Sequence, residues 1–375
     1  MHKCLTCGAE LKGEPLLLLK NAPGYAQHLP DEKEVKTDKG IDLEVRQCDY
    51  CGLVQMDCEP VAYYRDVIRA SGISDMMRRL RMEQYSYLIR NYNLEGKSII
   101  EIGCGQGDSL EPLLIFPVKA YGIEHDSKMV ETAQKNGLNV WRAFPETADT
   151  QLENAPFDAF VMFNFLEHQP KPNDMLRCIY NNLSPEGIGL ITVPFVYSEY
   201  SFIFHEFMRD HLSYYTEDSL RVLLERNGFE LLEQKTEEET LSVIVRKRRP
   251  TDFSSVKENM ETVRSSIVRF CEKCKEQGER IAMWGASHQA FSVLSVIGKE
   301  AEISYIMDSA DFKQGKFSPA SHVPIVSPDH FFKDPVSCIF IVSPDYAEEI
   351  AKIAKARFGE SVETYTLRGN EIISL

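Results

Sequence analysis

The stretch from Ser98 to Asp126, SIIEIGCGQGDSLEPLLIFPVKAYGIEHD, constrains the fold more than any other part of the sequence. Its isoleucine-rich start, Ser98–Ile102, predicts a fully buried strand. Three glycines follow at alternate positions, and then a leucine-rich segment with helical spacing, Ser109–Ile115. Strand, glycine turn and helix in this order are typical of a nucleotide site in a doubly wound α/β sheet. There the glycines let the backbone approach the ligand, and the helix N-terminus presents free N–H groups.

An acidic residue at the end of the next predicted strand indicates which ligand the glycine turn serves. Val118–Ile123 is that strand, and Glu124 closes it at the position where a carboxylate accepts hydrogen bonds from both ribose hydroxyls. The dinucleotide pattern requires glycine at position 108, but Asp108 stands there. Glu101 would also place a negative charge beside any phosphate, whereas it suits a ligand with an ammonium and a sulfonium group.

The spacing E-x-G-x-G-x-G with a distal glutamate resembles the first two motifs of class I S-adenosylmethionine (SAM) methyltransferases. SAM is therefore the predicted cofactor. The residues predicted to bind it are Glu101, Gly103, Gly105, Gly107, Glu124 and, at the end of a later strand, Asn164. The alternative interpretation is an ordinary glycine turn in an α/β protein.

Two CxxCG motifs near the N-terminus predict a metal site. Each glycine permits the tight turn that aims two thiolates at one ion, and two such motifs supply four sulfur ligands. The predicted Zn²⁺ ligands are Cys4, Cys7, Cys48 and Cys51. Four thiolates leave no open position, so the metal is predicted to be structural, in a module (1–60) that does not fold without it. The alternative is two unrelated pairs of reduced cysteines.

The length and charge of the chain limit its architecture and its partners. A chain of 375 residues is expected to form two or three domains, and a net charge of −15 argues against nucleic acid or an anionic membrane as a partner. No apolar run approaches the ~18 residues of a membrane span, and no apolar signal region follows the N-terminus. We therefore expect a cytoplasmic enzyme that acts on a small molecule as a monomer or homodimer.

The pattern of elements predicts an α/β chain with three parts after the zinc-binding module. These are a helical linker or cap (61–95), a Rossmann-like SAM domain (96–250) and a second Rossmann-like α/β domain (251–375). The linker is predicted to contain Tyr63 and Tyr64 in a helix. In the second α/β domain the strand Arg280–Trp284 leads into a turn with one glycine, where Ser287 and a helix N-terminus are suited to a phosphate.

Two histidines are candidates for acid–base chemistry. Phe157–Phe163 predicts the fourth strand of the SAM domain, and residues at its carboxyl end, among them His168, face the substrate in an open α/β sheet. A long aromatic connection, 194–216, is predicted to form a lid. It contains Asp210 and His211, a pair suited to general acid–base catalysis. The alternatives are a helix-capping role for His168 and purely structural hydrogen bonds for His211.

Together these features resemble the family of sugar C-methyltransferases that act on nucleotide-linked deoxysugars. The features that carry the resemblance are the two CxxCG motifs with Gln55, the EIGCGQG loop, Leu166-Glu167-His168, the run DHLSYYT (210–216), Gly285-Ala286-Ser287, Asp308 with KQGK (313–316), and VPIVSP (323–328). They extend over nearly the whole chain. The resemblance implies an N-terminal zinc-binding module, a central SAM domain and a Rossmann-like C-terminal domain.

The resemblance also implies roles for individual residues. His211 would be the base, oriented by Asp210, while His168 assists and Tyr64 contacts the substrate. Two positions depart from the family pattern: Asp210 stands in place of a glutamate, and Met208 in place of a tyrosine found in sugar-modifying members.

The function that follows is C-methylation of a nucleotide-linked keto deoxysugar. The base removes a proton next to a carbonyl, and the carbanion takes the methyl group of SAM in line. An O- or N-methyltransferase acting on a sugar or another small metabolite is the first alternative. A further alternative is an NAD-dependent oxidoreductase built on the second α/β domain, although the single glycine of its turn argues against this. The last alternative is a non-catalytic SAM-binding scaffold.

Overall fold

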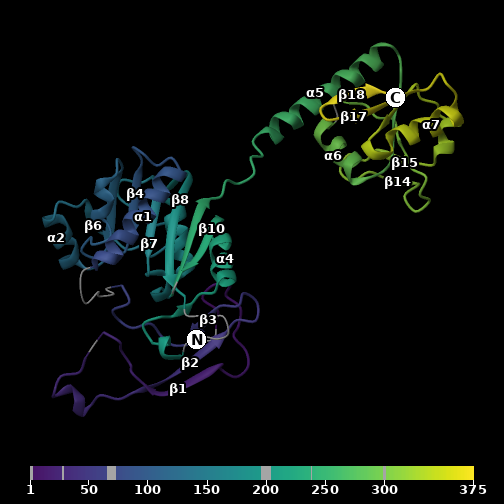
Figure 1. Cartoon of the computed structure of the whole chain (residues 1–375). Helices are drawn as coiled ribbons and strands as arrows, with labels where there is room; N and C mark the ends of the chain where they lie inside the picture. The colour runs from purple at the N-terminus through teal and green to yellow at the C-terminus, as the bar shows by residue number, and fades with distance from the viewer. Residues whose placement is uncertain (1–2, 28, 66–72, 196–203, 238, 299–300) are drawn as a thin grey trace. The chain divides into compact units, whose positions relative to one another are not determined.

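The computed structural model describes residues 3–375 except 28, 66–72, 196–203, 238 and 299–300. The chain divides into two compact units, an N-terminal unit (Met1–Pro250) and a C-terminal unit (Thr251–Leu375), which are described separately (Figure 1). Within the described ranges, no helix combines the length and the apolar character that a membrane span requires.

A seven-stranded sheet forms the centre of the N-terminal unit. Its strands are β4 (Ser98–Ile102), β5 (Lys119–Glu124), β6 (Val140–Arg142), β7 (Phe157–Phe163), β8 (Leu183–Pro194), β10 (Phe229–Glu237) and β11 (Thr240–Lys247). Their order is β10-β11-β8-β7-β4-β5-β6. The strands from β8 to β6 are parallel, whereas β11 pairs antiparallel with both β8 and β10. This is a doubly wound sheet, so the predicted fold class is confirmed.

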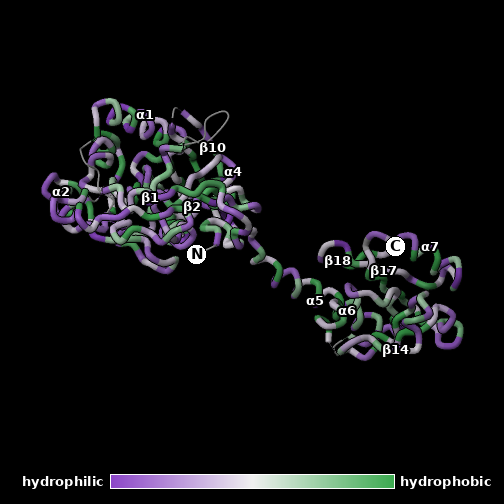
Figure 2. The backbone as a smooth tube through the Cα atoms, turned by 90° about the horizontal axis from the view of Figure 1, so that it is seen from below, coloured by the Kyte–Doolittle hydropathy of each residue, from purple (hydrophilic) through white to green (hydrophobic). Residues whose placement is uncertain are grey.

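Helices cover both faces of this sheet because successive residues of a strand point to opposite sides. In β7, Phe160 and Met162 belong to one apolar cluster, and Val161 and Phe163 belong to the other. The helices on the first cluster are α3 (Pro172–Asn181) and α4 (Glu217–Arg226), and those on the second are α1 (Asp75–Asn91) and α2 (Ser127–Lys135). Figure 2 shows hydrophobic (green) and hydrophilic (purple) stretches following one another along the backbone.

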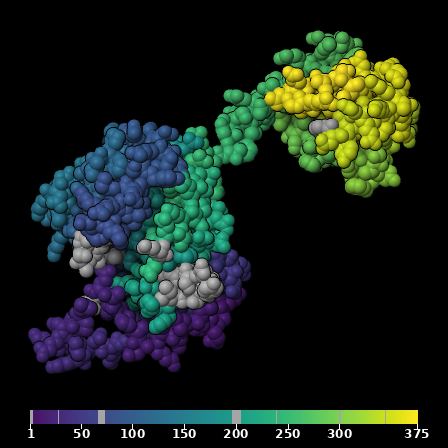
Figure 3. Space-filling view, viewed as in Figure 1, coloured from purple at the N-terminus to yellow at the C-terminus, as the bar shows by residue number. Residues whose placement is uncertain are grey.

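The N-terminal residues build a second, antiparallel sheet that the sequence did not predict. Its strands, in order, are β1 (Leu17–Ala22), β2 (Ile41–Gln47), β3 (Val54–Met56) and β9 (Ser213–Tyr214). The last strand belongs to the long connection between β8 and α4, and it pairs with β3 through Val54 and Gln55. Figure 3 shows the N-terminal residues as a purple lobe against the central domain, with teal residues of this connection lying on it.

The prediction of an α-helix directly after the glycine turn is wrong. Ser109–Ile115 forms only a short 3₁₀ helix, η2 (Glu111–Ile115). Pro117 disfavours a helical conformation at the preceding residue, and Phe116 is extended, with φ −92° and ψ 152°. The leucine spacing reflects burial, since Leu113 packs in the core under α1 and α2.

The linker and the lid also differ from prediction. Tyr63 and Tyr64 lie in a turn, and the helix of this region, α1, begins only at Asp75, where the Ser74 hydroxyl accepts a hydrogen bond from the backbone of Met77. Part of the predicted lid, 196–203, falls outside the described residues. The remainder forms a short 3₁₀ helix, a turn and β9, so it extends the N-terminal sheet.

The C-terminal unit is a second Rossmann-like α/β fold, as predicted. Its strands are β12 (Ile281–Trp284), β13 (Ile306–Met307), β14 (Lys316–Phe317), β15 (Pro324–Val326), β16 (Cys338–Ile341), β17 (Glu363–Arg368) and β18 (Glu371–Ser374). Their order is β14-β15-β13-β12-β16-β17-β18, parallel except at the two edges. The helices are α5 (Ser255–Glu276), α6 (His288–Ile297) and α7 (Ala347–Phe358). The strands β14, β15 and β18 were not predicted.

Candidate active site and metal centre

The glycine turn after β4 and the acid at the end of β5 are hydrogen-bonded to each other. The backbone N–H of Gly105 donates to one carboxylate oxygen of Glu124 over 2.9 Å. The N–H groups of His125 and Asp126 donate to the other oxygen over 2.6 and 2.9 Å. Burial raises the pKa of Glu124, and these backbone donors act in the opposite direction. The carboxylate therefore lies at the turn that follows β4, the strand that carries the buried Glu101.

The three glycines of the turn have positive φ but different surroundings. A Cβ on Gly103 would lie 2.7 Å from the ring of Phe165, and one on Gly107 would lie 2.1 Å from Leu138 Cδ1. Beside Gly105, the nearest atom that a Cβ would meet is 3.9 Å away. Gly103 and Gly107 are thus required by packing. Gly105 leaves open space next to Glu124, and this cradle fits a cofactor that approaches the backbone.

Alanine at Gly105 is expected to lower mainly the affinity for SAM, whereas alanine at Gly107 is expected to lower mainly the stability of the fold. The Gly105→Ala variant should lower SAM affinity at least ~10-fold, because its methyl group occupies the cradle, and should cost only about 1–2 kcal/mol of stability from its positive φ. The Gly107→Ala variant should cost about 2–4 kcal/mol, because overpacking against Leu138 adds to the same φ penalty. Calorimetric titration with SAM and urea unfolding measure the two effects. Equal SAM affinity in wild type and Gly105→Ala would contradict the cradle.

Asn164, the remaining predicted cofactor residue, stands at the carboxyl end of β7. Its side-chain oxygen accepts a hydrogen bond from the Thr192 hydroxyl over 2.9 Å, and its backbone N–H donates to the Thr192 carbonyl. These bonds fix Asn164, which has a φ of 45°, at the carboxyl end of the central strand β7. The next residue, Phe165, places its ring over Gly103. Asn164 is therefore adjacent to the turn that it was predicted to serve.

His168 is buried, and its tautomer is fixed by the backbone. It ends the 3₁₀ helix η3 (Leu166–His168), and its Nδ1 lies 2.8 Å from the carbonyl oxygen of Asp210. A carbonyl oxygen only accepts, so Nδ1 carries the proton, and the neutral ring presents a lone pair at Nε2. Burial lowers the pKa of His168, which keeps the ring neutral at pH 7.

His211 lies directly beside His168. The two ring centroids are 4.8 Å apart, with the ring planes 73° to each other. Burial, with a further contribution from His168, lowers the pKa of His211 to about 3. The structure thus brings together the two histidines that the sequence singled out, and burial keeps both rings neutral at pH 7.

The Asp210 carboxylate does not take the position predicted for it. Its two oxygens accept hydrogen bonds from the Tyr63 hydroxyl over 2.9 and 3.1 Å, and one of them accepts from the backbone N–H of Ala26 over 3.1 Å. It therefore holds the loop after β1 rather than His211. Asp210 positions the other histidine instead, through its backbone carbonyl.

Tyr64 lies at the same edge of the sheet as the histidines. Its ring is 6.1 Å from that of Phe144, which in turn is 6.3 Å from Phe165 beside the glycine turn. Tyr64 and Phe144 line a small depression with Gln169, the residue after His168. Burial raises the pKa of Tyr64, so its hydroxyl remains a hydrogen-bond donor at neutral pH.

Two residues that contact the predicted groups were not among the candidates. Tyr63 binds Asp210, and Glu167 places its Oε1 3.7 Å from His168 Nε2. Each stands next to a candidate residue in the sequence, and this adjacency was the signal that could have identified them. In a turn or a 3₁₀ helix, however, adjacency along the chain does not say which of two neighbours points into a site.

Acid is expected to destabilise the N-terminal unit through its buried histidines. Both have a lowered pKa when folded, so between that pKa and the ordinary value near 6.5 the unfolded chain binds more protons. Stability is then lost as pH falls below about 6.5, by up to ~1.4 kcal/mol per pH unit for each histidine. Urea unfolding at pH 7.5 and pH 5 measures this loss, followed by Trp141 fluorescence in a Trp284→Phe background. The His211→Gln variant should lose less stability over this interval, and equal losses would contradict the assignment.

The four predicted metal ligands converge in the structure. Cys4 Sγ lies 3.4 Å from Cys51 Sγ, Cys7 Sγ lies 3.5 Å from Cys48 Sγ, and all four sulfurs are within 4.8 Å of one another. Tetrahedral zinc with bonds of about 2.3 Å places sulfurs about 3.8 Å apart, so the cluster fits this ion. Both turns have the same design: the glycine after each second cysteine has positive φ and donates its N–H to the carbonyl of the first.

Polar side chains connect the cysteine cluster to the rest of the N-terminal unit. Buried Gln55 of β3 accepts the N–H of Leu5 over 2.9 Å and donates to the carbonyl of Lys3 over 3.1 Å, which explains its place beside the CxxCG motifs. Asn173 of α3 donates to the carbonyls of Leu5 and Thr6. The first cysteine turn is thus bound both to the N-terminal sheet and to the central domain.

The turn after β12 in the C-terminal unit is closed by its own residues. The Ser287 hydroxyl, suggested as a phosphate ligand, accepts the N–H of Ala290 and caps α6. Asp308 accepts the N–H of Ala286 over 2.8 Å and pairs with Lys313 over 2.8 Å. The pKa of Asp308 is lowered by Lys313 and by backbone donors, against an opposing effect of burial.

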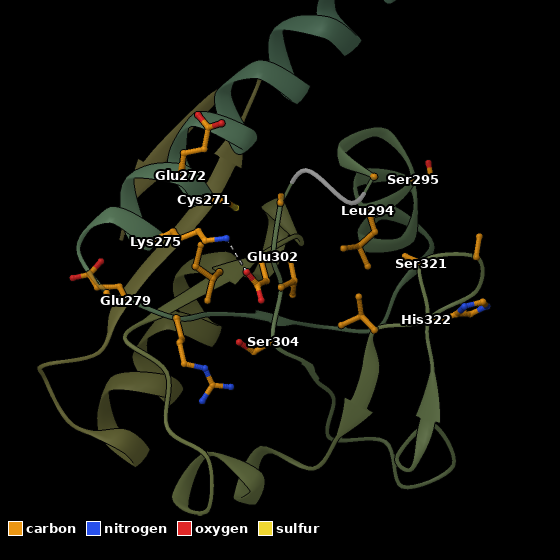
Figure 4. A pocket seen from close by; sticks show the side chains of 18 residues that line it. Cys271, Glu272, Lys275, Glu279, Leu294, Ser295, Glu302, Ser304, Ser321 and His322 are labelled. Carbon is orange, nitrogen blue, oxygen red and sulfur yellow. Dashed lines mark hydrogen bonds and ion pairs between the residues drawn. The ribbon is translucent and has the colours of Figure 1, made fainter.

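A cavity of about 930 Å³ lies elsewhere in the C-terminal unit (Figure 4). Its lining comes from segments that precede the strands, such as 278–280, 301–304 and 320–323, and from the ends of α5 and α6. Lys275 and Glu302 pair at its rim over 3.3 Å. Because these segments precede the strands, the cavity is at the amino ends of the strands, on the opposite side of the sheet from the Ser287 turn. Ligands of open α/β sheets bind at the carboxyl ends of strands instead.

Two family models match the chain in consecutive segments. Residues 76–234 match a methyltransferase domain, and residues 219–363 match the C-methyltransferase C-terminal domain. The first segment contains the glycine turn, Glu124 and both histidines. The second begins in α4 and extends through most of the C-terminal unit.

Among curated proteins, the chain is 23% identical to the C-methyltransferase NovU of Streptomyces niveus, over 93% of this chain and 91% of NovU. It is also 28% identical to a ubiquinone biosynthesis O-methyltransferase of Pseudomonas fluorescens and 31% identical to that of Caulobacter vibrioides. These two matches cover 27% and 26% of this chain and less than half of each relative (46% and 40%).

Solved structures with a similar arrangement include magnesium protoporphyrin IX methyltransferase from Synechocystis, with a TM-score of 0.38 and 15% identity over 50% of this chain and 93% of that chain. The [4+2]-cyclase SpnF matches with a TM-score of 0.39 and 16% identity over 48% of this chain and 85% of that chain.

Proposed function

We propose that this chain, which is a SAM-dependent C-methyltransferase, methylates a carbon atom next to the keto group of a nucleotide-linked deoxysugar. The observation that carries the proposal is the pair of buried, neutral histidines, one of which follows β7 in a segment whose Phe165 packs over Gly103 of the glycine turn. A carbon atom next to a ketone needs a base to remove its proton, because this C–H group is too weakly acidic for water to deprotonate it at a useful rate.

The cofactor would be held by residues of β4, β5 and the turn between them. Glu124 is placed to accept the ribose hydroxyls, the open side of Gly105 admits the backbone approach, and buried Glu101 suits the positively charged end. SAM, when bound, supplies an electrophilic methyl group and turns from a sulfonium into a neutral thioether.

The residues of the chain then divide the proton chemistry between them. His211 takes the proton from the carbon next to the carbonyl. His168 is not the donor to the enolate oxygen, because its only N–H in the neutral form, at Nδ1, is bound to the Asp210 carbonyl. That role falls to Tyr64, whose hydroxyl stays protonated.

Transfer of a ¹³C-labelled methyl group from SAM to a panel of nucleoside-diphosphate 4-keto-6-deoxyhexoses tests the proposal. We expect a product with one added methyl group and a new carbon–carbon coupling in its ¹³C spectrum. A labelled methyl on oxygen would replace the proposal by O-methylation, the activity named in the ubiquinone relatives, and a labelled methyl on nitrogen would replace it by N-methylation. Transfer to none of the sugars, with SAM still bound, would reject the substrate class. Titration with NAD is the control for the oxidoreductase alternative.

We propose in addition that the cysteine cluster holds one structural Zn²⁺. Support comes from the donor set of four thiols, their spacing and the repeated glycine turns. All four positions of a tetrahedral ion would be filled by Cys4, Cys7, Cys48 and Cys51, so the metal takes no part in the reaction.

A further inference from the structure

We propose that Glu167 is the positioning residue for the base: its carboxylate stabilises the protonated form of His211. This inference rests on the proposed role of His211 in the function above. It differs from the family resemblance, which implied that the acid beside His211 in the sequence, Asp210, would do this.

The first step is that Asp210 is committed elsewhere. Its carboxylate is bound to the Tyr63 hydroxyl and to the N–H of Ala26, and it faces the loop after β1. The Asp210 carboxylate lies outside the cluster formed by Glu167, His168 and His211, and its charge acts on His168 rather than on His211.

The second step is that Glu167 is in place. One nitrogen of His168, one nitrogen of His211 and one carboxylate oxygen of Glu167 lie within 4.8 Å of one another, and Glu167 is only 2% exposed. The backbone carbonyl of Glu167 accepts the N–H of Leu212, the residue after His211, over 2.8 Å. The same residue thus fixes the segment directly after His211 through its backbone and brings its carboxylate to the two imidazoles.

The third step is the chemistry of a buried base. Desolvation makes an imidazole reluctant to become charged, so His211 alone in this environment is a weak proton acceptor. An opposite charge within ~4–6 Å raises the affinity for the proton by about 1–3 pKa units. When His211 takes the substrate proton, the pair of imidazolium and Glu167 carboxylate is neutral overall, and the proton leaves to water after the product does.

The other groups around His211 do not offer this charge. His168 from η3 is neutral and bound to a carbonyl. In the turn before His211, the Asp210 carboxylate binds Tyr63, and Arg209 donates to the Gly24 carbonyl. Burial raises the pKa of Tyr214 and Tyr215, so both hydroxyls stay neutral. Among the described residues, Glu167 is the carboxylate of this cluster.

A substrate-free test is ¹⁵N NMR of histidine side chains in the full chain with S-adenosylhomocysteine bound. The His211 resonance is followed from pH 8.5 to the acid limit of the folded protein, in wild type and in Glu167→Gln. We expect protonation of His211 to begin at least one pH unit higher in wild type. The same onset in both proteins, or a ring that stays neutral in both, would overturn the proposal.

Glu206→Gln is the matched control, because Glu206 lies at the same 3.7 Å from the Nε2 of an exposed histidine, His205. It should leave the His211 titration unchanged. If wild type methylates a 4-keto-6-deoxyhexose, Glu167→Gln should lower kcat at least ~10-fold at equal SAM affinity and shift the pH profile of kcat, and Glu167→Asp should recover part of the loss. Absence of methylation in wild type would reject the proposed function, while the NMR titration would still decide the role of Glu167.

A metal titration separates this role from metal ligation, since two imidazoles and a carboxylate are also a ligand set for a divalent cation. The zinc-replete chain should bind no second equivalent of Zn²⁺ or Mn²⁺ that Glu167→Gln removes. A second equivalent lost in that variant would overturn the proposal.

Discussion

Replacing His211 by alanine is expected to lower kcat for methyl transfer at least ~10²-fold while SAM affinity stays within a factor of about two. Removal of the imidazole takes away the proton acceptor but leaves the glycine cradle and Glu124 untouched, because these belong to β4, β5 and the turn between them. Steady-state kinetics with the keto sugar and calorimetric titration with SAM measure the two quantities separately.

His205→Ala is the control for this experiment. His205 belongs to the same long connection but is exposed, and its ring is directed to Phe204 and Glu206 rather than to His168. Its loss should leave kcat unchanged. Equal turnover in His211→Ala and wild type would remove His211 as the base. A parallel loss of SAM affinity would instead indicate that the substitution disturbs the cradle.

The central sheet was predictable because its information is local. Phe157–Phe163 is a continuous apolar run, and the structure has β7 with these bounds. Likewise, the polar residues Thr216 and Asn227 are the N-cap and C-cap of α4. Burial on both faces and capping chemistry leave a signature in the residues of the element itself.

The N-terminal sheet was not predictable for the opposite reason. β9 has two residues, and its pairing with β3 joins positions that are far apart in the chain. The direction of the Asp210 carboxylate depends in the same way on Tyr63 and Ala26, which only the folded chain brings near. The sequence therefore singled out His168 and His211, which lie together in the structure, but it did not indicate that Glu167 rather than Asp210 joins their cluster.

Removing the metal of the cysteine cluster is expected to abolish methyl transfer while leaving SAM binding largely intact. Structural zinc contributes about 10–16 kcal/mol in small zinc-binding domains, which is comparable to the whole net stability of a typical domain, roughly 5–15 kcal/mol. Without the ion, the turns around Cys4 and Cys48 lose their cross-link, and Gln55 loses the ordered partners that hold β3.

The effect should reach the active site through the pairing of β3 with β9. Met56 donates its N–H to the carbonyl of Leu212, and Gln55 pairs with Ser213, so the segment that follows His211 is an edge strand of the N-terminal sheet. The base would then lose its fixed position, and kcat should fall at least ~10²-fold, as in His211→Ala. One side of the SAM cradle packs in the core between the central sheet and α1 and α2, which contains none of the four cysteines, so SAM affinity should change less than kcat.

A strong chelator applied to wild type, and the variant Cys48→Ser, test this coupling, with zinc content determined by mass spectrometry. Cys58→Ser is the control, because Cys58 is a half-buried cysteine outside the cluster. One zinc per chain in wild type and in Cys58→Ser, and none in Cys48→Ser, is the expected result. Full turnover of a zinc-free chain would show that the base keeps its position without the metal. Loss of SAM binding together with turnover would show that the N-terminal unit folds as one cooperative body, in which the metal stabilises the cradle as much as the base.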